Sequence, residues 1–118
     1  MPDFDTLEIY AAIREVTRFI GGLEDRFPAD ELGGLYARLN ETAVAVGAAL
    51  AAGYGRDGLD DGGNLSAATA RDVRGRLGEL KHYVLAAESR YYLDEAHVSR
   101  FTELYERIRA GLPGGAGS

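Results

Sequence analysis

Four stretches of this chain place core-type residues at alternating intervals of three and four positions, which is the spacing of one face of an α-helix. These positions are Ile9, Ile13, Val16, Ile20, Leu23 and Phe27; Leu32, Leu35, Leu39, Thr42, Val46 and Ala49; Val73, Leu77, Leu80, Val84, Ala87 and Tyr91; and Val98, Phe101, Tyr105, Ile108 and Leu112. No stretch shows the period-two alternation of a half-buried strand. The sequence therefore predicts an all-α fold of four amphipathic helices.

The connections between these stretches indicate the topology. Those near residues 26–29 and 91–94 are short, which makes sequential helices antiparallel neighbours, whereas the middle one, residues 54–65, is longer. We expect an up-down antiparallel four-helix bundle over residues 1–112. A glycine-rich tail over residues 113–118 should be flexible.

Residues with helix-capping chemistry precede three of the predicted helices. They are Asp5, paired with Glu8 as a capping box, then Asn64 or Ser66, and finally Asp94. Gly111 and Pro113 are placed to end the fourth helix.

The run from Gly53 to Gly58 spells G-x-G-x-x-G, the pattern of dinucleotide-binding turns. In such turns the glycines follow a strand and open a helix, whose N-terminus holds the phosphate. Here they follow a long helical pattern, and Asp57, Asp60 and Asp61 would repel a phosphate. We instead expect Gly53 to stop the second helix in a left-handed conformation.

Two patterns raise the question of a metal. Glu79 and His82 form an E-x-x-H pair, but a di-iron bundle needs a second pair and two further inward glutamates. No second pair exists, and both residues fall on the outer face of the third helix. We expect a solvated pair and no metal there.

The acidic loop after residue 56 invites comparison with a calcium-binding loop. An EF-hand loop starting at Asp57 would need an oxygen ligand at position 59 and a glutamate at position 68. Leu59 and Ala68 stand there instead. The sequence therefore predicts no metal and no other cofactor.

The net charge is −6, from 19 acidic and 13 basic residues. Domains that coat themselves in nucleic acid are usually basic, so the overall charge disfavours such a partner. The third helix is locally basic, with Arg71, Arg74, Arg76 and Lys81 as a candidate face for RNA or an acidic partner. The alternative is ordinary surface pairing with neighbouring acids of the same helix.

Several features indicate where the chain works and what it does not do. It contains no cysteine, which excludes disulfides and thiolate metal sites and suits a reducing cytoplasm. It has no secretory leader pattern and no apolar stretch of membrane-spanning length, so we expect a cytoplasmic protein with no membrane contact. No nucleophile motif accompanies His82 or His97, so we expect no enzymatic activity.

The segment from Thr42 to Gly55, TAVAVGAALAAGYG, contains 14 residues and no charge. A helix that is apolar all round must be covered on both sides, and small side chains let another backbone approach closely. A second copy of the chain is the economical cover. The predicted interface residues are Val44, Ala45, Ala48, Ala49 and Ala52. Tyr91, which continues the third apolar face, is expected in the core or in an interface.

Residues 26–56, RFPADELGGLYARLNETAVAVGAALAAGYGR, resemble the signature of a bacterial family of four-helix-bundle proteins first noticed as reading frames in 23S rRNA intervening sequences. Members typically read F-P, an acidic helix start and then A-V-S-I-P-x-N-I-A-E-G-Y-G-R. The signature residues matched at its end are Gly53, Tyr54, Gly55 and Arg56. The run YYLDEAHVSRFTELYERIRAGL is similar to the family's fourth helix.

This resemblance implies a homo-oligomer, often a ring of five bundles, with no known catalytic activity. A related branch, the basic accessory proteins of diversity-generating retroelements, serves a reverse transcriptase. This chain has Gly47, Ala49 and Ala52 where the family has Pro, Asn and Glu. We expect a non-enzymatic scaffold or adaptor that assembles as a ring, with a pentamer favoured. The alternative is an RNA-associated or reverse-transcriptase accessory protein.

Overall fold

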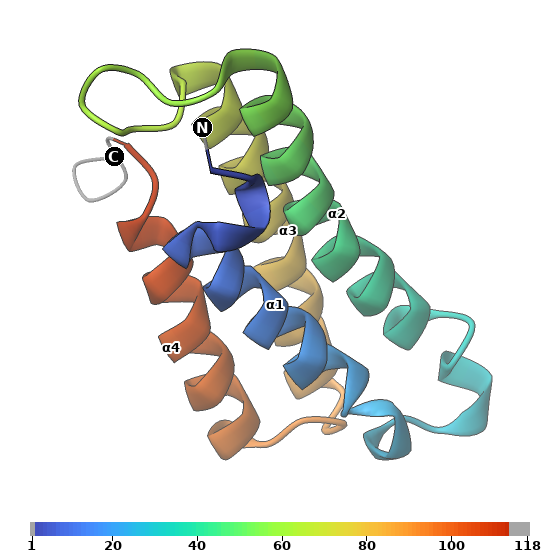
Figure 1. The fold of residues 1–118 in the computed structure, drawn as a ribbon. Helices are drawn as coiled ribbons and strands as arrows, with labels where there is room; N and C mark the ends of the chain where they lie inside the picture. The colour runs from blue at the N-terminus through green and yellow to red at the C-terminus, as the bar shows by residue number, and fades with distance from the viewer. Residues whose placement is uncertain (1, 114–118) are drawn as a thin grey trace.

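Four α-helices run alternately up and down the long axis of the molecule (Figure 1). The structure is a computed structural model that describes residues 2–113, so the predicted tail lies almost entirely outside the described residues. The elements are η1 (Phe4–Thr6), α1 (Glu8–Gly21), η2 (Glu24–Arg26), η3 (Ala29–Glu31), α2 (Leu35–Asp57), α3 (Ala67–Ser89) and α4 (Glu95–Ala110). Across residues 2–113 there is no strand, only an isolated bridge between Leu59 and Leu65. The all-α bundle predicted from the sequence is confirmed.

The predicted apolar faces form most of the core. The face of α1 is buried over its whole predicted length, including Leu23 and Phe27, which lie beyond the end of the helix. The face of α3 is buried from Val73 to Ala87. Full burial of a Val, Leu, Ile or Phe side chain stabilises a fold by roughly 1.5–3 kcal/mol. These two faces therefore hold the bundle together as the spacing predicts.

The predicted face of α2 is displaced at both ends. The helix begins at Leu35, because the two 3₁₀ turns η2 and η3 occupy the chain around Pro28. Leu32 is only half-buried, and near the other end Leu50 is fully buried while Ala49 is half-buried. An α-helix has 3.6 residues per turn, so a face read at intervals of 3.5 drifts by about 20° per heptad. That drift moves the core position from Ala49 to Leu50.

The buried face of α4 also differs from the predicted one. Leu104 is fully buried, whereas Val98 and Tyr105, which were predicted to be core residues, are half-buried. Phe101 and Ile108 are buried as predicted. The predicted and observed faces of α4 therefore overlap without coinciding.

Two of the predicted caps are observed. The Ser66 hydroxyl oxygen accepts a hydrogen bond from the Thr69 backbone N–H at 3.1 Å and so caps α3. At the start of α4, Asp94 Oδ1 accepts from the His97 N–H at 3.0 Å, and His97 Nδ1 accepts from the Asp94 N–H at 3.2 Å. This reciprocal pair is a capping box, and it fixes the backbone where α4 begins.

The capping box predicted at Asp5 and Glu8 is wrong. Asp5 lies within η1, whose cap is Asp3, and α1 follows Leu7 without a side-chain cap. The chain tightens into a 3₁₀ turn before α1, which moves Asp5 away from the N-cap position.

Tyr91 does not continue the buried face of α3, so the prediction of a core position is wrong, whereas its placement in an interface stays a prediction. The helix ends at Ser89, and Tyr91 takes a left-handed backbone conformation, φ 64°, with 92% of its surface exposed. Tyr92 faces inward instead: its ring lies 5.2 Å from that of Phe27, and its hydroxyl donates to Glu31 Oε2 at 3.2 Å. A left-handed residue turns the chain sharply, which exchanges the directions of the two tyrosines.

Gly53 does not stop α2, contrary to the prediction. The helix continues to Asp57, and Gly58, at φ 62°, ends it. Gly53 is buried within the last two turns, where a β-carbon would lie 2.2 Å from Thr69 Oγ1 and 2.7 Å from Thr69 Cβ. Glycine is needed here because α2 and α3 approach each other too closely for any side chain.

We predict that Gly53→Ala destabilises the protein by about 1–3 kcal/mol, the usual cost of forcing extra atoms into a packed core. The measurement is the free energy of unfolding in urea. Gly55→Ala is the matched control, because Gly55 lies two residues away in the same helix with open space around its α-carbon. It should stabilise the protein by about 0.5–1 kcal/mol through helix propensity. Equal stability of the two variants would contradict the proposed role of Gly53.

Candidate interaction surface

Between Glu41 and Arg56, the outer side of α2 is exposed and carries no charge. Val44 is 60% exposed, and Ala48 and Ala52, each one turn further along, are also exposed. We call these three residues the α2 stripe. Ala45 and Ala49, the other predicted interface residues, are half-buried, and Ala49 faces a hollow beside α3. The structure thus brings three of the five predicted residues to one exposed face.

A hollow of about 440 Å³ lies next to the stripe, between α1 and α2. We call it the α1–α2 groove, and its lining residues are Phe4, Tyr10, Ile13, Arg14, Thr17, Arg18, Val44, Gly47, Ala48 and Ala51. A β-carbon on Gly47 would lie 3.4 Å from Ile13 Cγ2, so the floor of the groove is already closely packed. The groove is mainly apolar with a polar edge supplied by α1.

Two arginines form that edge. Arg14 and Arg18 lie one turn apart on α1, and both are exposed. Neither has an ion pair within residues 2–113, because Glu15, the nearest acid on α1, accepts from Arg107 of α4 at 2.5 Å. The groove therefore has an unpaired basic edge on a chain whose net charge is −6.

The predicted site did not include this contribution from α1. A signal was present in the sequence, since no acidic residue lies three or four positions from Arg14. Pairing within a helix depends on that spacing. The groove itself has no sequence signal, because it depends on how α1 packs against α2.

The signature residues at the end of α2 have structural roles. Tyr54 is buried, and its hydroxyl donates to the carbonyl oxygen of Pro2, which holds the N-terminal segment against α2. Gly53 allows the close approach of α3 described above. Arg56 forms an ion pair with Asp57, 2.9 Å between Nη2 and Oδ2. Gly55 is exposed and makes no close approach.

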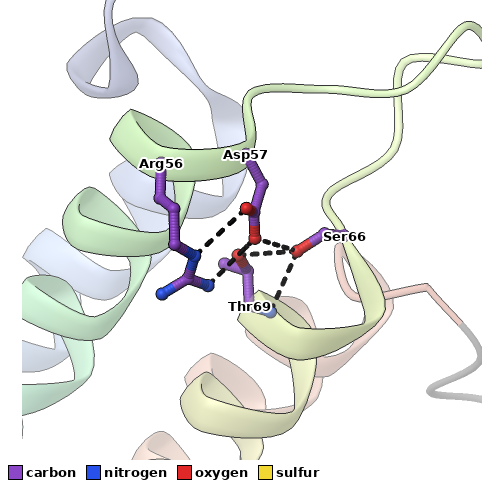
Figure 2. Close-up of polar contacts among 4 residues, drawn as sticks. All are labelled: Arg56, Asp57, Ser66 and Thr69. Carbon is purple, nitrogen blue, oxygen red and sulfur yellow. Dashed lines mark hydrogen bonds and ion pairs between the residues drawn. The ribbon is translucent and has the colours of Figure 1, made fainter.

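Figure 2 shows the cluster that joins the end of α2 to the start of α3, composed of Arg56, Asp57, Ser66 and Thr69. We call it the clasp. The Ser66 hydroxyl donates to Asp57 Oδ2 at 2.7 Å, and Thr69 Oγ1 lies 3.4 Å from the same oxygen. The hydrogen bond from Arg56, followed by that from Ser66, lowers the pKa of Asp57 to about 2. The clasp therefore stabilises the helix junction more when Asp57 is ionised than when it is protonated.

Two of the three carboxylates in the acidic stretch from Asp57 to Asp61 form hydrogen bonds within it or to the start of α3. Asp57 belongs to the clasp, and Asp60 Oδ1 accepts from the backbone N–H groups of Gly62 and Asn64, each at 2.9 Å. These contacts shape the loop as a turn between two helices. The glycine run that resembles a nucleotide-binding turn thus closes a helix and does not follow a strand.

Glu79 and His82 lie on the exposed outer side of α3. Glu79 accepts from Arg76 at 3.3 Å, and the ring of His82 lies 5.6 Å from that of Tyr83. Within residues 2–113, no group of three or more His, Cys, Asp or Glu side chains is gathered to hold a metal ion.

The four basic residues of α3 point to two different sides. Arg71 and Arg76 line a hollow with Ala49 of α2. Arg74 donates to the carbonyl oxygen of Pro113, and Lys81 Nζ lies 4.8 Å from the ring centre of Tyr105 on α4. Arg74 Nε has no hydrogen-bond partner among the described residues. The candidate basic face is therefore divided between the α2 side and the α4 side of α3.

Comparison with known proteins identifies no relative: no family model, curated protein or solved structure matches the chain. The family resemblance through Gly53–Arg56 therefore remains a prediction. None of the helices described over residues 2–113 has the length and apolar character needed to cross a membrane.

We predict that Asp57→Asn reduces the dependence of stability on acid pH. The pKa of Asp57 is about 2 in the folded chain against a usual 3.8, so ionised Asp57 stabilises the fold above about pH 4 and loses this effect as the pH falls toward 2. The urea midpoint of the wild type should be higher than that of the variant at neutral pH. This difference should shrink as the pH falls and be smallest near pH 2.

Asp61→Asn is the control for this titration, since Asp61 lies exposed in the same loop and makes no side-chain hydrogen bond among the described residues. It should keep the wild-type pH profile. A constant difference between Asp57→Asn and wild type from pH 7 to pH 2 would show that the clasp does not depend on ionisation.

Proposed function

We propose that this chain is a non-enzymatic, self-assembling four-helix-bundle protein that acts as an oligomeric scaffold or adaptor. The observation that supports this proposal is the exposed, uncharged α2 stripe of Val44, Ala48 and Ala52. The resemblance to the bacterial bundle family favours a closed ring of five copies. The absence of cysteine suits assembly in a reducing cytoplasm.

The exposed sides of α2 and α3 differ in charge. The two helices have the same length, 23 residues each. The exposed side of α3 carries charges of both signs, among them Arg76 and Glu79, which pair with each other. The exposed side of α2 carries none between Glu41 and Arg56. An exposed apolar face rimmed by polar residues is typical of a protein interaction site.

Small side chains make the stripe suitable for a close contact between backbones. Ala48 and Ala52 present one methyl group each, so a second helix or turn can lie directly against α2. Such a contact has few mobile side chains to order, which lowers the entropic cost of association. The stripe holds no charged group that would select a particular partner, so it does not identify what a scaffold of this kind would bind.

We predict that the wild type sediments as a multimer at micromolar concentration and that Ala48→Arg lowers its assembly state. Arginine at the centre of the stripe would place a charge without a partner in the interface, which opposes burial. Ala48 is preferred over Ala45 or Ala49, because a new arginine at position 49 would also meet Arg71 beside α3. Analytical ultracentrifugation gives the mass, and circular dichroism checks that helix content is kept.

Ser99→Arg is the control, since it adds the same charge at an exposed position of α4 and should leave the assembly state unchanged. A wild-type monomer would contradict the proposal and make a different protein the cover of the stripe. Retention on RNA that weakens steeply with added salt would favour the alternative RNA-associated function.

A further inference from the structure

The most exposed large hydrophobic side chain among the described residues is Tyr91, in the connection between α3 and α4. It is 92% exposed and has a left-handed backbone, φ 64°, the one non-glycine residue with positive φ among those described. A bulky residue in this conformation is strained, and such strain persists where function requires it. Tyrosine combines a large apolar ring with a polar tip and is enriched in protein interfaces.

The surroundings of Tyr91 are acidic. Glu88, Asp94 and Glu95 lie within four residues of it. The two arginines beside the connection are both engaged: Arg90 is bound to Glu31 with 2.6 Å between Nη1 and Oε2, and Arg26 Nε donates to the carbonyl oxygen of Tyr92 at 3.4 Å. Asp94 is engaged by the backbone of α4, and its side chain stays exposed. The connection therefore presents an aromatic ring within a negatively charged rim.

The α1–α2 groove has the complementary properties. It is a mainly apolar hollow of about 440 Å³, within the range of cavities that enclose small organic groups. Its edge carries Arg14 and Arg18, which have no acidic partner among the described residues. Its wall includes Val44 and Ala48 of the α2 stripe.

We propose that Tyr91 of one copy inserts into the α1–α2 groove of a second copy, with the acidic connection facing Arg14 and Arg18. This inference rests on the proposed self-assembly and specifies its contact. A chain's own Tyr91 cannot fill its own groove: the α3–α4 connection lies at the end of the bundle opposite the N-terminus, whereas Phe4, which lines the groove, lies beside the N-terminus (Figure 1). The molecule is 47 Å long.

This contact joins two different surfaces, so it is heterologous. Each copy donates its tyrosine to one neighbour and receives a tyrosine from another, and such a series of contacts closes into a ring when the rotation between neighbours is a whole fraction of a full turn. A symmetric contact of two α2 stripes would instead stop at a dimer. The two arrangements respond differently to mutation.

The test begins with Tyr91→Gly, measured by analytical ultracentrifugation and urea unfolding. Glycine accepts positive φ without strain, so this variant should fold fully, with a cooperative urea transition. We expect it to be monomeric at concentrations where the wild type is a multimer. Leu85→Ala is the control: it shortens a different exposed apolar side chain, on α3, and should assemble like the wild type.

The decisive step mixes two assembly-deficient variants. Tyr91→Gly retains its groove, and Ala48→Glu, whose carboxylate blocks the groove and repels the acidic connection, retains its tyrosine. An equimolar mixture should form a 1:1 complex and nothing larger, because only one tyrosine and one open groove are compatible. Each variant alone should stay monomeric.

Two results would overturn the inference while leaving self-assembly intact. One is assembly of Tyr91→Gly to the wild-type mass, and the other is a mixture that stays monomeric up to the highest concentration at which the wild type is fully assembled. A wild-type monomer is a separate outcome, which would remove the proposed function and this contact together.

Discussion

The close approach of α2 and α3 at Gly53 and Thr69 is the constraint on which the rest of the bundle depends. A β-carbon on Gly53 would meet Thr69 Oγ1 at 2.2 Å, so the Thr69 side chain of α3 packs directly against the backbone of α2 at this point. Ser66 and Asp57 tie the same junction by a 2.7 Å hydrogen bond. With this pair of helices held together at one end, α1 and α4 pack against it and complete the core.

The same choice of small residues shapes both sides of α2. On the inner side Gly53 admits α3, and beside α1 Gly47 lies against Ile13, where a β-carbon would already be in tight contact at 3.4 Å. On the outer side Ala48 and Ala52 leave the helix surface flat and uncharged. A helix built for close contact on its inner faces therefore presents a close-contact surface outward as well, which is the physical basis of the proposed assembly.

Charge is unevenly distributed around this scaffold. The net charge is −6, and Glu88, Asp94 and Glu95 lie in or beside the connection between α3 and α4 at one end of the bundle. Arg14 and Arg18 on α1 remain unpaired among the described residues. Opposite charges on separate surfaces of one chain favour contact between copies in one orientation and disfavour others. The proposed contact of Tyr91 with the α1–α2 groove uses this asymmetry.

The sequence by itself determined the helices, their order and most of the core, because the 3–4 spacing of apolar residues follows from the geometry of the α-helix. It also determined the start of α4 at Asp94, since the capping bonds join residues three positions apart. Only the tertiary structure decided the rest. From the sequence, Gly53 is predicted to stop a helix, and only the packing of Thr69 against it shows its role within the helix. From the sequence, Tyr91 is predicted to continue an apolar face, and only its positive φ shows that the chain turns there. The α1–α2 groove likewise exists only between two packed helices. Contacts between residues far apart in the chain leave no periodic signal, and for that physical reason the candidate interaction surface became visible only in the folded protein.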